Sequence, residues 1–277
     1  MSPAGSPDGG NGTGPVDPAL LPYLSGLKAQ PAVEVLAAFE TPCDPALTLP
    51  AYNADRLLDP APLKVENGWC RQETAAGFVA VRTPMPGVTP EMVDWWFDWH
   101  PRRPERYRAW HPGAHRDNRV DPPAVPGGKP YWGAVNHAVE DLGDGDITAR
   151  IEFLDPVDFG FGPDALAGEA VGTIVCARVG DRVARHTQMA HVFLRDGDGL
   201  VLRSHFWLGG VVELRLPRGL PNLNRPLGPL LDSKTLRRAL LKDSTIRGLA
   251  VHCAEEYTNL AAILPPLYER FGGGDDE

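Results

Sequence analysis

The residues best suited to chemistry gather in one stretch, residues 95–118. It contains three histidines, one tyrosine and four tryptophans: His100, His111, His115, Tyr107, Trp95, Trp96, Trp99 and Trp110. Aromatic side chains of this size are usually buried or line a pocket. Histidines placed among them are candidate metal ligands or acid–base groups. The stretch therefore predicts part of a buried polar site with aromatic walls.

A second candidate group lies far downstream, in residues 247–271. His252 and Glu256 stand four residues apart, so on a helix both side chains lie on one face about one turn apart. Zinc accepts imidazole and carboxylate ligands, although a surface His–Glu pair is the commoner fate of this spacing. Polar groups on an apolar helix need a partner, and the neighbours here are Ala250, Val251, Cys253 and Leu260. We therefore expect one metal ion to join this helix to residues 95–118.

Two pairs of alternatives remain for the other ligands. His115 and His111 compete for one position, because His111 stands beside a tryptophan and a proline and is equally suited to a structural role. Glu140 and Glu152 compete for the next. Glu152 is flanked by apolar residues, so in a strand it points to the opposite face, which is usually solvent-exposed. Glu140, just before a turn, is favoured.

Other polar residues could act on a substrate. His191 lies in an apolar strand, QMAHVFL, where a buried hydrogen-bonded histidine and a catalytic one are equally compatible with the pattern. His186 and His205 rank lower. Asn118 could orient a substrate oxygen, although a lone asparagine is more often a turn residue. The sequence has no GxSxG, P-loop, GxGxxG at a strand–helix turn or HExxH motif, which argues against the chemistries that those motifs support.

Composition narrows the class of protein. The 277 residues carry a net charge of −9 and a pI near 5.4, which argues against nucleic acid or an anionic membrane as partner. No apolar run reaches the ~20 residues needed to cross a bilayer, and the N-terminus lacks the features of a secretory signal. The four cysteines show no CxxC spacing and suit reduced thiols in the cytoplasm: Cys43, Cys70, Cys176 and Cys253.

The order of expected elements indicates an α+β fold. Residues 1–17 read as a disordered tail, residues 18–85 as an N-terminal subdomain, and residues 86–277 as the main domain. Thr89 and Pro90 begin a helix, and a second short helix over residues 104–115 would carry Tyr107, His111 and His115, although Pro112 and Gly113 interrupt it.

The second half of the chain is expected to form strands and then helices. Residues 131–214 alternate as consecutive strands joined by tight turns, which suggests one antiparallel meander. A turn-rich loop over residues 217–229 follows. A two-part helix over residues 234–271 then ends at Pro265–Pro266. A curved antiparallel sheet with a long C-terminal helix across its concave face is the helix-grip arrangement, which encloses an apolar cavity.

Three segments resemble the diacetylphloroglucinol hydrolase family, which includes phloretin hydrolase. They are residues 93–115, residues 203–210 and residues 251–271. The resemblance covers about residues 85–271, and it implies a Bet v 1-like helix-grip domain with an N-terminal subdomain used for homodimerisation. It also implies a zinc ion held by His115, Glu140, His252 and Glu256, with substrate contacts from Tyr107, Asn118 and His191. The chain departs from the family pattern at Gln188 and His205, so the identity of the substrate stays open.

The function expected on this basis is a cytoplasmic, zinc-dependent hydrolase. It would cleave the C–C bond between an acyl group and a polyhydroxylated phenol ring and release a carboxylic acid. The catalytic residues would be His191, Tyr107 and Asn118, with Trp110 and Phe206 also binding the small phenolic ketone, and the tryptophans would form a planar slot for the ring. Two alternatives are a metal-free, cyclase-like helix-grip enzyme and a non-catalytic binder of a hydrophobic aromatic ligand.

Overall fold

Eight antiparallel strands form a single sheet in the computed structural model, which describes residues 15–123, 128–216, 227, 230–231 and 233–273. The order across the sheet is β1-β2-β8-β7-β6-β5-β4-β3. Their bounds are Gly68–Arg71 (β1), Gly77–Met85 (β2), His115–Asp121 (β3), Val135–Asp141 (β4), Asp146–Leu154 (β5), Val171–Gly180 (β6), Ala184–Asp196 (β7) and Gly199–Leu214 (β8). The expected meander is confirmed for β4 to β8, where each strand pairs with the next.

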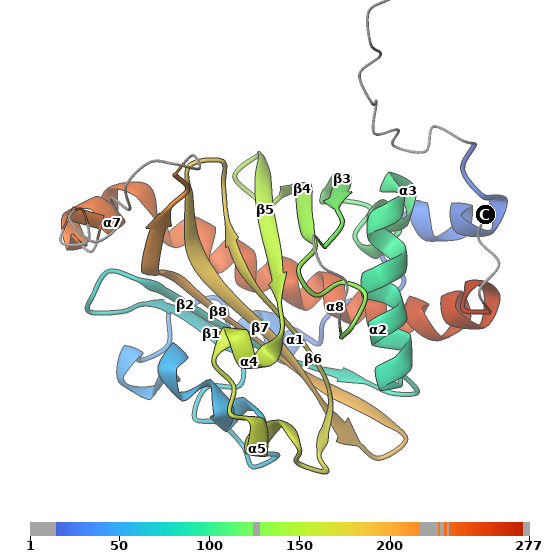
Figure 1. Ribbon diagram of the computed structural model, residues 1–277, viewed down its shortest axis with the longest axis horizontal. Coiled ribbons are helices and arrows are strands. Elements are labelled where there is room, and N and C mark those ends of the chain that lie inside the picture. The colour runs from blue at the N-terminus through green and yellow to red at the C-terminus, as the bar shows by residue number, and fades with distance from the viewer. Residues whose placement is uncertain (1–14, 124–127, 217–226, 228–229, 232, 274–277) are drawn as a thin grey trace, which may run out of the picture.

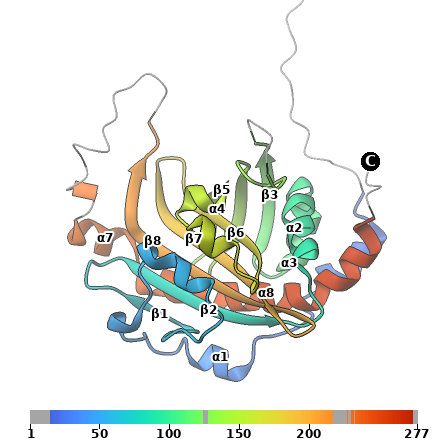
Figure 2. The same cartoon turned by 60° about the horizontal axis from the view of Figure 1, so that its bottom comes forward.

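The sheet curves around one long helix, α8 (Asp243–Phe271), which crosses its concave side (Figures 1 and 2). Two helices between β2 and β3, α2 (Pro90–Trp99) and α3 (Pro104–Trp110), pack against α8 beside the edge of the sheet. The helix-grip arrangement expected from the sequence is therefore confirmed. The other helical segments are short: η1 (Pro18–Leu24), α1 (Val33–Ala37), η2 (Pro45–Leu47), η3 (Ala51–Leu57), η4 (His100–Arg102), α4 (Pro156–Phe159), α5 (Pro163–Leu166) and α7 (Lys234–Leu240).

Alternate residues of each strand enter two different cores, as the period of a strand requires. In β2, Val79 and Val81 pack on the side of α8, whereas Phe78 and Ala80 belong to a second cluster on the opposite face. Residues 51–66 and the segment 156–166 cover that second face. The sheet is thus buried on both sides, and the side facing α8 holds the cavity described below.

The N-terminal part of the chain is joined to the sheet by polar contacts as well as by packing. Strands β1 and β2 are members of the sheet, so the segment outside it ends before Gly68. On the covered face, the buried Arg203 side chain donates hydrogen bonds to the carbonyl oxygens of Leu57 and Ala61 and pairs with Glu66. Most of the predicted tail over residues 1–17 and most of the loop over residues 217–229 lie outside the described residues.

The end of α8 differs from the expectation, because the helix continues through Pro265–Pro266 to Phe271. Each proline removes a backbone hydrogen bond, and aromatic packing on α2 holds the last turns in place. Trp95 lies edge-on to Tyr268, with ring centroids 5.3 Å apart, and Trp99 contacts Phe271 at 5.2 Å. Within the described residues, no helix has the length and apolar character needed to span a bilayer.

Candidate metal centre and cavity

His115 reaches the site from the first residue of β3. The predicted helix through His115 is wrong, because α3 ends at Trp110 and His111 leaves the helical conformation at φ −143° and ψ 85°. A tight turn follows, in which the N–H of His115 donates to the carbonyl of His111 at 2.8 Å. Strand pairing then sets His115 directly opposite Glu140 on β4.

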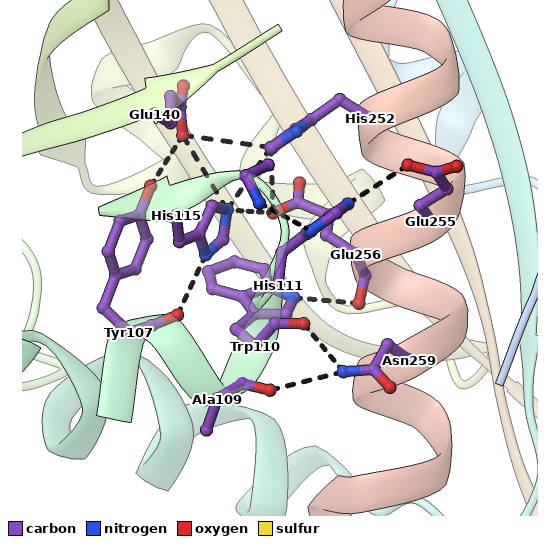
Figure 3. A network of polar contacts seen from close by, with 11 residues as sticks. Tyr107, Ala109, Trp110, His111, His115, Glu140, His252, Glu255, Glu256 and Asn259 are labelled. Carbon is purple, nitrogen blue, oxygen red and sulfur yellow. Dashed lines mark hydrogen bonds and ion pairs between the residues drawn. The ribbon is translucent and has the colours of Figure 1, made fainter. Parts of the chain in front are cut away.

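The four residues expected to bind metal come together at one point between β3, β4 and α8 (Figure 3). The Nε2 atoms of His115 and His252 are 3.3 Å apart. The Oε2 atom of Glu256 lies 3.4 Å from Nε2 of His115 and 3.7 Å from Nε2 of His252. The Oε2 atom of Glu140 lies 3.9 Å from each of these nitrogens.

The spacing of the two nitrogens fits a tetrahedral ion, and His115, Glu140 and His252 each offer a ligand atom within 4.8 Å of one another. Two nitrogens bound to zinc at ~2.0–2.1 Å in a tetrahedron are separated by about 3.3 Å, which is the spacing between His115 and His252. The Nδ1–H of His115 donates to the carbonyl of Tyr107 at 2.9 Å, so its Nε2 lone pair points toward the other three residues. Such a hydrogen bond is the usual means of orienting a metal-bound histidine.

The electrostatics of the cluster favour a cation. Burial lowers the pKa of His115 well below its usual value and that of His252 to about 3, in each case with a further contribution from a neighbouring histidine. Burial raises the pKa of Glu140, and burial together with the Glu140 charge raises the pKa of Glu256. Two carboxylates enclosed with two neutral imidazoles would be neutralised by a divalent ion, the chemistry to which this donor set is suited.

Neighbouring side chains fix the cluster. Tyr107 donates its hydroxyl proton to Oε2 of Glu140 at 2.6 Å, and its ring stacks on His115 with centroids 3.9 Å apart. His111, the rival ligand, instead contacts Glu255 through Nε2 at 3.1 Å and stacks parallel to the ring of His252 at 5.1 Å. Its Nδ1 accepts the backbone N–H of residue 114. His111 therefore supports His252 and does not face the other three residues.

Asn259 is a supporting residue that the sequence did not indicate. Its Nδ2 donates to the carbonyls of Ala109 and Trp110, and its Oδ1 accepts the backbone N–H of Lys28 at 2.6 Å. Trp110 in turn donates its indole N–H to the carbonyl of Glu256 at 3.0 Å. These contacts join α3 and the N-terminal segment to α8 one turn beyond the cluster. The available signal was the spacing of four and then three residues from His252 to Glu256 to Asn259, which places Asn259 on the same face of the helix as the two candidate ligands.

The cluster lies at the wall of a cavity of about 630 Å³ between the sheet and α8. The lining is mostly apolar, and the predicted substrate contacts all contribute to it: Tyr107, Trp110, Asn118, His191 and Phe206. Asn118 is 1% exposed, and neither atom of its amide has a hydrogen-bond partner among the described residues. Nδ1 of His191 lies 2.8 Å from the hydroxyl of Ser204, which orients the ring.

The structure also places the other residues considered from the sequence, and it corrects the expectation for the tryptophans. Of the four tryptophans in residues 95–110, Trp110 alone borders the cavity, so they do not form a planar slot for a ring. The carboxylate of Glu152 is paired with arginines, among them Arg150 at 3.0 Å, and is not part of the cluster. His186 lies on the cavity wall. His205 is buried on the opposite face of the sheet, beside Phe78 and Trp207.

Fold and site together define a helix-grip protein that has an apolar ligand cavity and a candidate metal centre in its wall. The sequence model of the family described as DAPG hydrolase PhiG domain matches residues 49–269, and the chain belongs to this family. The prediction of a hydrolase is confirmed by this membership.

Two curated relatives extend the comparison. The chain is 30% identical over 260 residues to phloretin hydrolase from Eubacterium ramulus, covering 89% of this chain and 87% of the relative. It is 29% identical over 241 residues to 2,4-diacetylphloroglucinol hydrolase from Pseudomonas protegens, covering 82% and 75%. Among solved structures, norcoclaurine synthase from Thalictrum flavum matches with a TM-score of 0.34 and 8% identity, covering 68% of this chain and 95% of that one.

Proposed function

We propose that the chain hydrolyses the C–C bond between an acyl group and a polyhydroxylated phenol ring, with a zinc ion held by His115, Glu140, His252 and Glu256. The observation that carries the proposal is the convergence of these four side chains, with ligand atoms 3.3–3.9 Å from one another across the pairs described above, at the wall of a cavity large enough for such a ketone. The names of the two relatives support the substrate class.

Hydrolysis of such a ketone proceeds in three steps. The proton of a ring hydroxyl moves to the ring carbon that bears the acyl group, which turns the ring into a keto tautomer. The oxygen of a water molecule adds to the acyl carbon as the water loses a proton, and the bond from that carbon to the ring then breaks. The bonding pair enters the ring as an enolate instead of a bare aryl carbanion. The proton lost by the water is returned to the enolate oxygen, which gives the phenol, and the acyl group leaves as a carboxylic acid.

The chain's own groups are placed to assist these changes. The chemistry that a zinc ion supplies at such a site is polarisation of the acyl oxygen and activation of water. Burial, with the Glu140 charge, raises the pKa of Tyr107, so the phenol stays protonated. Its O–H donates to Glu140, and its oxygen presents a lone pair to a ring hydroxyl of the substrate. Asn118 offers another hydroxyl an amide that has no partner within the described part of the chain. His191 is assigned to proton transfer, because it lines the cavity as a neutral imidazole that Ser204 orients.

The proposal is tested by turnover of acylphloroglucinols before and after treatment with a chelator. We expect release of the free phloroglucinol and of the carboxylic acid, loss of both after chelation, and recovery when one equivalent of zinc is added. Full turnover by protein shown to be metal-free would reject the zinc site and favour the cyclase-like alternative. Tight binding of the ketone without turnover in the zinc-loaded protein would favour a non-catalytic binder. The homodimer and the cytoplasmic location stay predictions.

Zinc binding is expected to release protons from the protein. The raised pKa values of Glu140 and Glu256 mean that the metal-free site retains carboxyl protons at a pH where exposed glutamates have lost them. The lowered pKa values of His115 and His252 mean that the imidazoles contribute none. Affinity should therefore fall as the pH falls through the raised pKa values of these two carboxyl groups. Calorimetry in buffers of different ionisation enthalpy counts the protons, and Glu256→Gln should release fewer. Affinity and proton count that do not change with pH would contradict the expectation.

A further inference from the structure

Asn136 is a buried polar residue of the cavity to which nothing above gives a role. It lies on β4, is 3% exposed and borders the cavity. Its Oδ1 atom has no hydrogen-bond partner among the described residues. A buried acceptor without a partner is destabilising, and most such atoms in proteins are satisfied. An unpartnered amide oxygen beside an apolar cavity is therefore best explained by a ligand that donates a hydrogen bond to it.

The position of Asn136 along β4 indicates which part of a ligand it meets. Asn136, Ala138 and Glu140 alternate along the strand and all border the cavity. Asn136 and Glu140 are four positions apart, which corresponds to ~13 Å along a strand. Asn136 therefore lies at the far end of a row of side chains that begins at the candidate metal centre. Between them, the small side chain of Ala138 leaves room for a flat ring. Asn118 pairs with Ala138 across β3 and β4, which sets its free amide at the side of that space.

The other direction along the cavity carries exposed apolar side chains among its lining residues. Ile147 on β5 stands directly opposite Glu140 and borders the cavity while 42% exposed. Val183, in the turn between β6 and β7, borders the same opening and is 65% exposed. A ketone whose carbonyl lies at the metal centre can therefore direct its acyl chain toward this opening and its ring toward Asn136. The reverse orientation would leave the amides of Asn118 and Asn136 against hydrocarbon.

We propose that Asn136 determines specificity by accepting a hydrogen bond from the ring hydroxyl para to the acyl group. This inference rests on the proposed function and names the substrate class more closely, as acylphenols that carry a hydroxyl opposite the acyl carbon. With the acyl-bearing carbon near Glu140 and the ring over Ala138, the para position is the one nearest Asn136. A site built to bind a hydroxyl discriminates strongly against the analogue that lacks it, because its own polar group is then left unpaired.

The test compares two ketones with the same acyl group, one with a 2,4,6-trihydroxyphenyl ring and one with a 2,6-dihydroxyphenyl ring. Both are assayed with zinc-loaded wild-type protein and with Asn136→Ala and Asn136→Val. The difference in intrinsic reactivity of the two ketones is common to all three proteins. It cancels when the kcat/KM preference of a variant is divided by that of the wild type. We expect the preference for the trihydroxy ketone in kcat/KM to fall on the order of 10- to 100-fold in each variant. An unchanged preference in a folded variant would overturn the proposal.

Two further measurements separate this role from a structural one. Removal of a buried side chain whose Oδ1 has no partner among the described residues should leave Tm unchanged or raised, most clearly in Asn136→Val, because valine suits a strand. A large drop in Tm would assign Asn136 to the fold. His137→Ala is the matched control, since His137 is on the same strand, bonded to Asp121 and outside the cavity, and should keep the wild-type preference. If neither ketone is turned over, the proposed function fails, and dissociation constants of the two ketones for the same proteins still decide the role of Asn136.

Discussion

Replacing His252 by alanine is expected to remove the bound zinc and to lower kcat/KM for an acylphloroglucinol by at least ~10³-fold, since a Lewis acid supplies several kcal/mol of transition-state stabilisation. His252 provides one of the two nitrogens that are 3.3 Å apart. Among the described residues, the group that could hold a metal ion contains no histidine other than His115 and His252. Metal content by elemental analysis and kcat/KM are the measurements. Glu256→Gln should give the same two losses while preserving the volume of the side chain.

His111→Ala is the informative control for that result. His111 is also buried, and its ring is parallel to that of His252, but it is bonded to Glu255 and to the backbone of residue 114. Its removal should weaken zinc binding by ~10–100-fold, as the loss of an orienting neighbour does, and leave one zinc per chain at saturating metal. Stoichiometric zinc in both His252→Ala and Glu256→Gln would refute the ligand set. Loss of zinc in His111→Ala with retention in His252→Ala would make His111 the ligand.

Two of the four proposed metal ligands can be predicted from local sequence alone. His252 and Glu256 are one turn apart on a helix, so their convergence depends only on helical geometry, and the long final helix is indicated by its apolar spacing. The meander is equally local, because alternation and tight turns specify each hairpin. The helix-grip arrangement follows once a curved sheet must bury its concave side against that helix.

The other half depends on contacts between distant residues. His115 faces Glu140 only because the chain leaves α3 after Trp110 and turns into β3, and the pattern of residues 104–115 reads as a helix. Glu152 is excluded from the cluster by Arg185 on β7 and by Arg215 just after β8, which no local pattern of β5 reveals. The expectation that the tryptophans line the substrate cavity failed because residue type alone does not show which contact a large ring makes. Large apolar rings are needed equally at a ligand cavity and at a helix contact, and those of Trp95 and Trp99 hold the end of α8 beyond its two prolines.

Replacing His191 by alanine is expected to lower kcat by ~10²–10⁴-fold, the usual contribution of a positioned proton-transfer group, while zinc content stays at one per chain. Burial, with a smaller contribution from His205, lowers the pKa of His191 to about 3. The imidazole is then neutral at every pH above about 4, so His191 itself should cause no loss of activity as the pH falls from 8 to 6. Any loss in that range is assigned to proton competition at the metal centre. Ser204→Ala, which removes the partner of Nδ1, should lower kcat by a smaller factor.

His205→Phe supplies the matched control, because His205 is the counterpart of His191 on the neighbouring strand β8. Both histidines are buried, and burial lowers the pKa of each to about 3. They lie on opposite faces of the sheet, however, and His205 contacts Phe78 and Trp207, away from the cavity. A phenyl ring suits those neighbours and removes two ring nitrogens that lack partners among the described residues, so His205→Phe should keep kcat and zinc content. Wild-type kcat in folded, zinc-loaded His191→Ala would show that the proton is moved by another group. Equal losses in both histidine variants would mean that the integrity of the sheet, and not proton transfer, was measured.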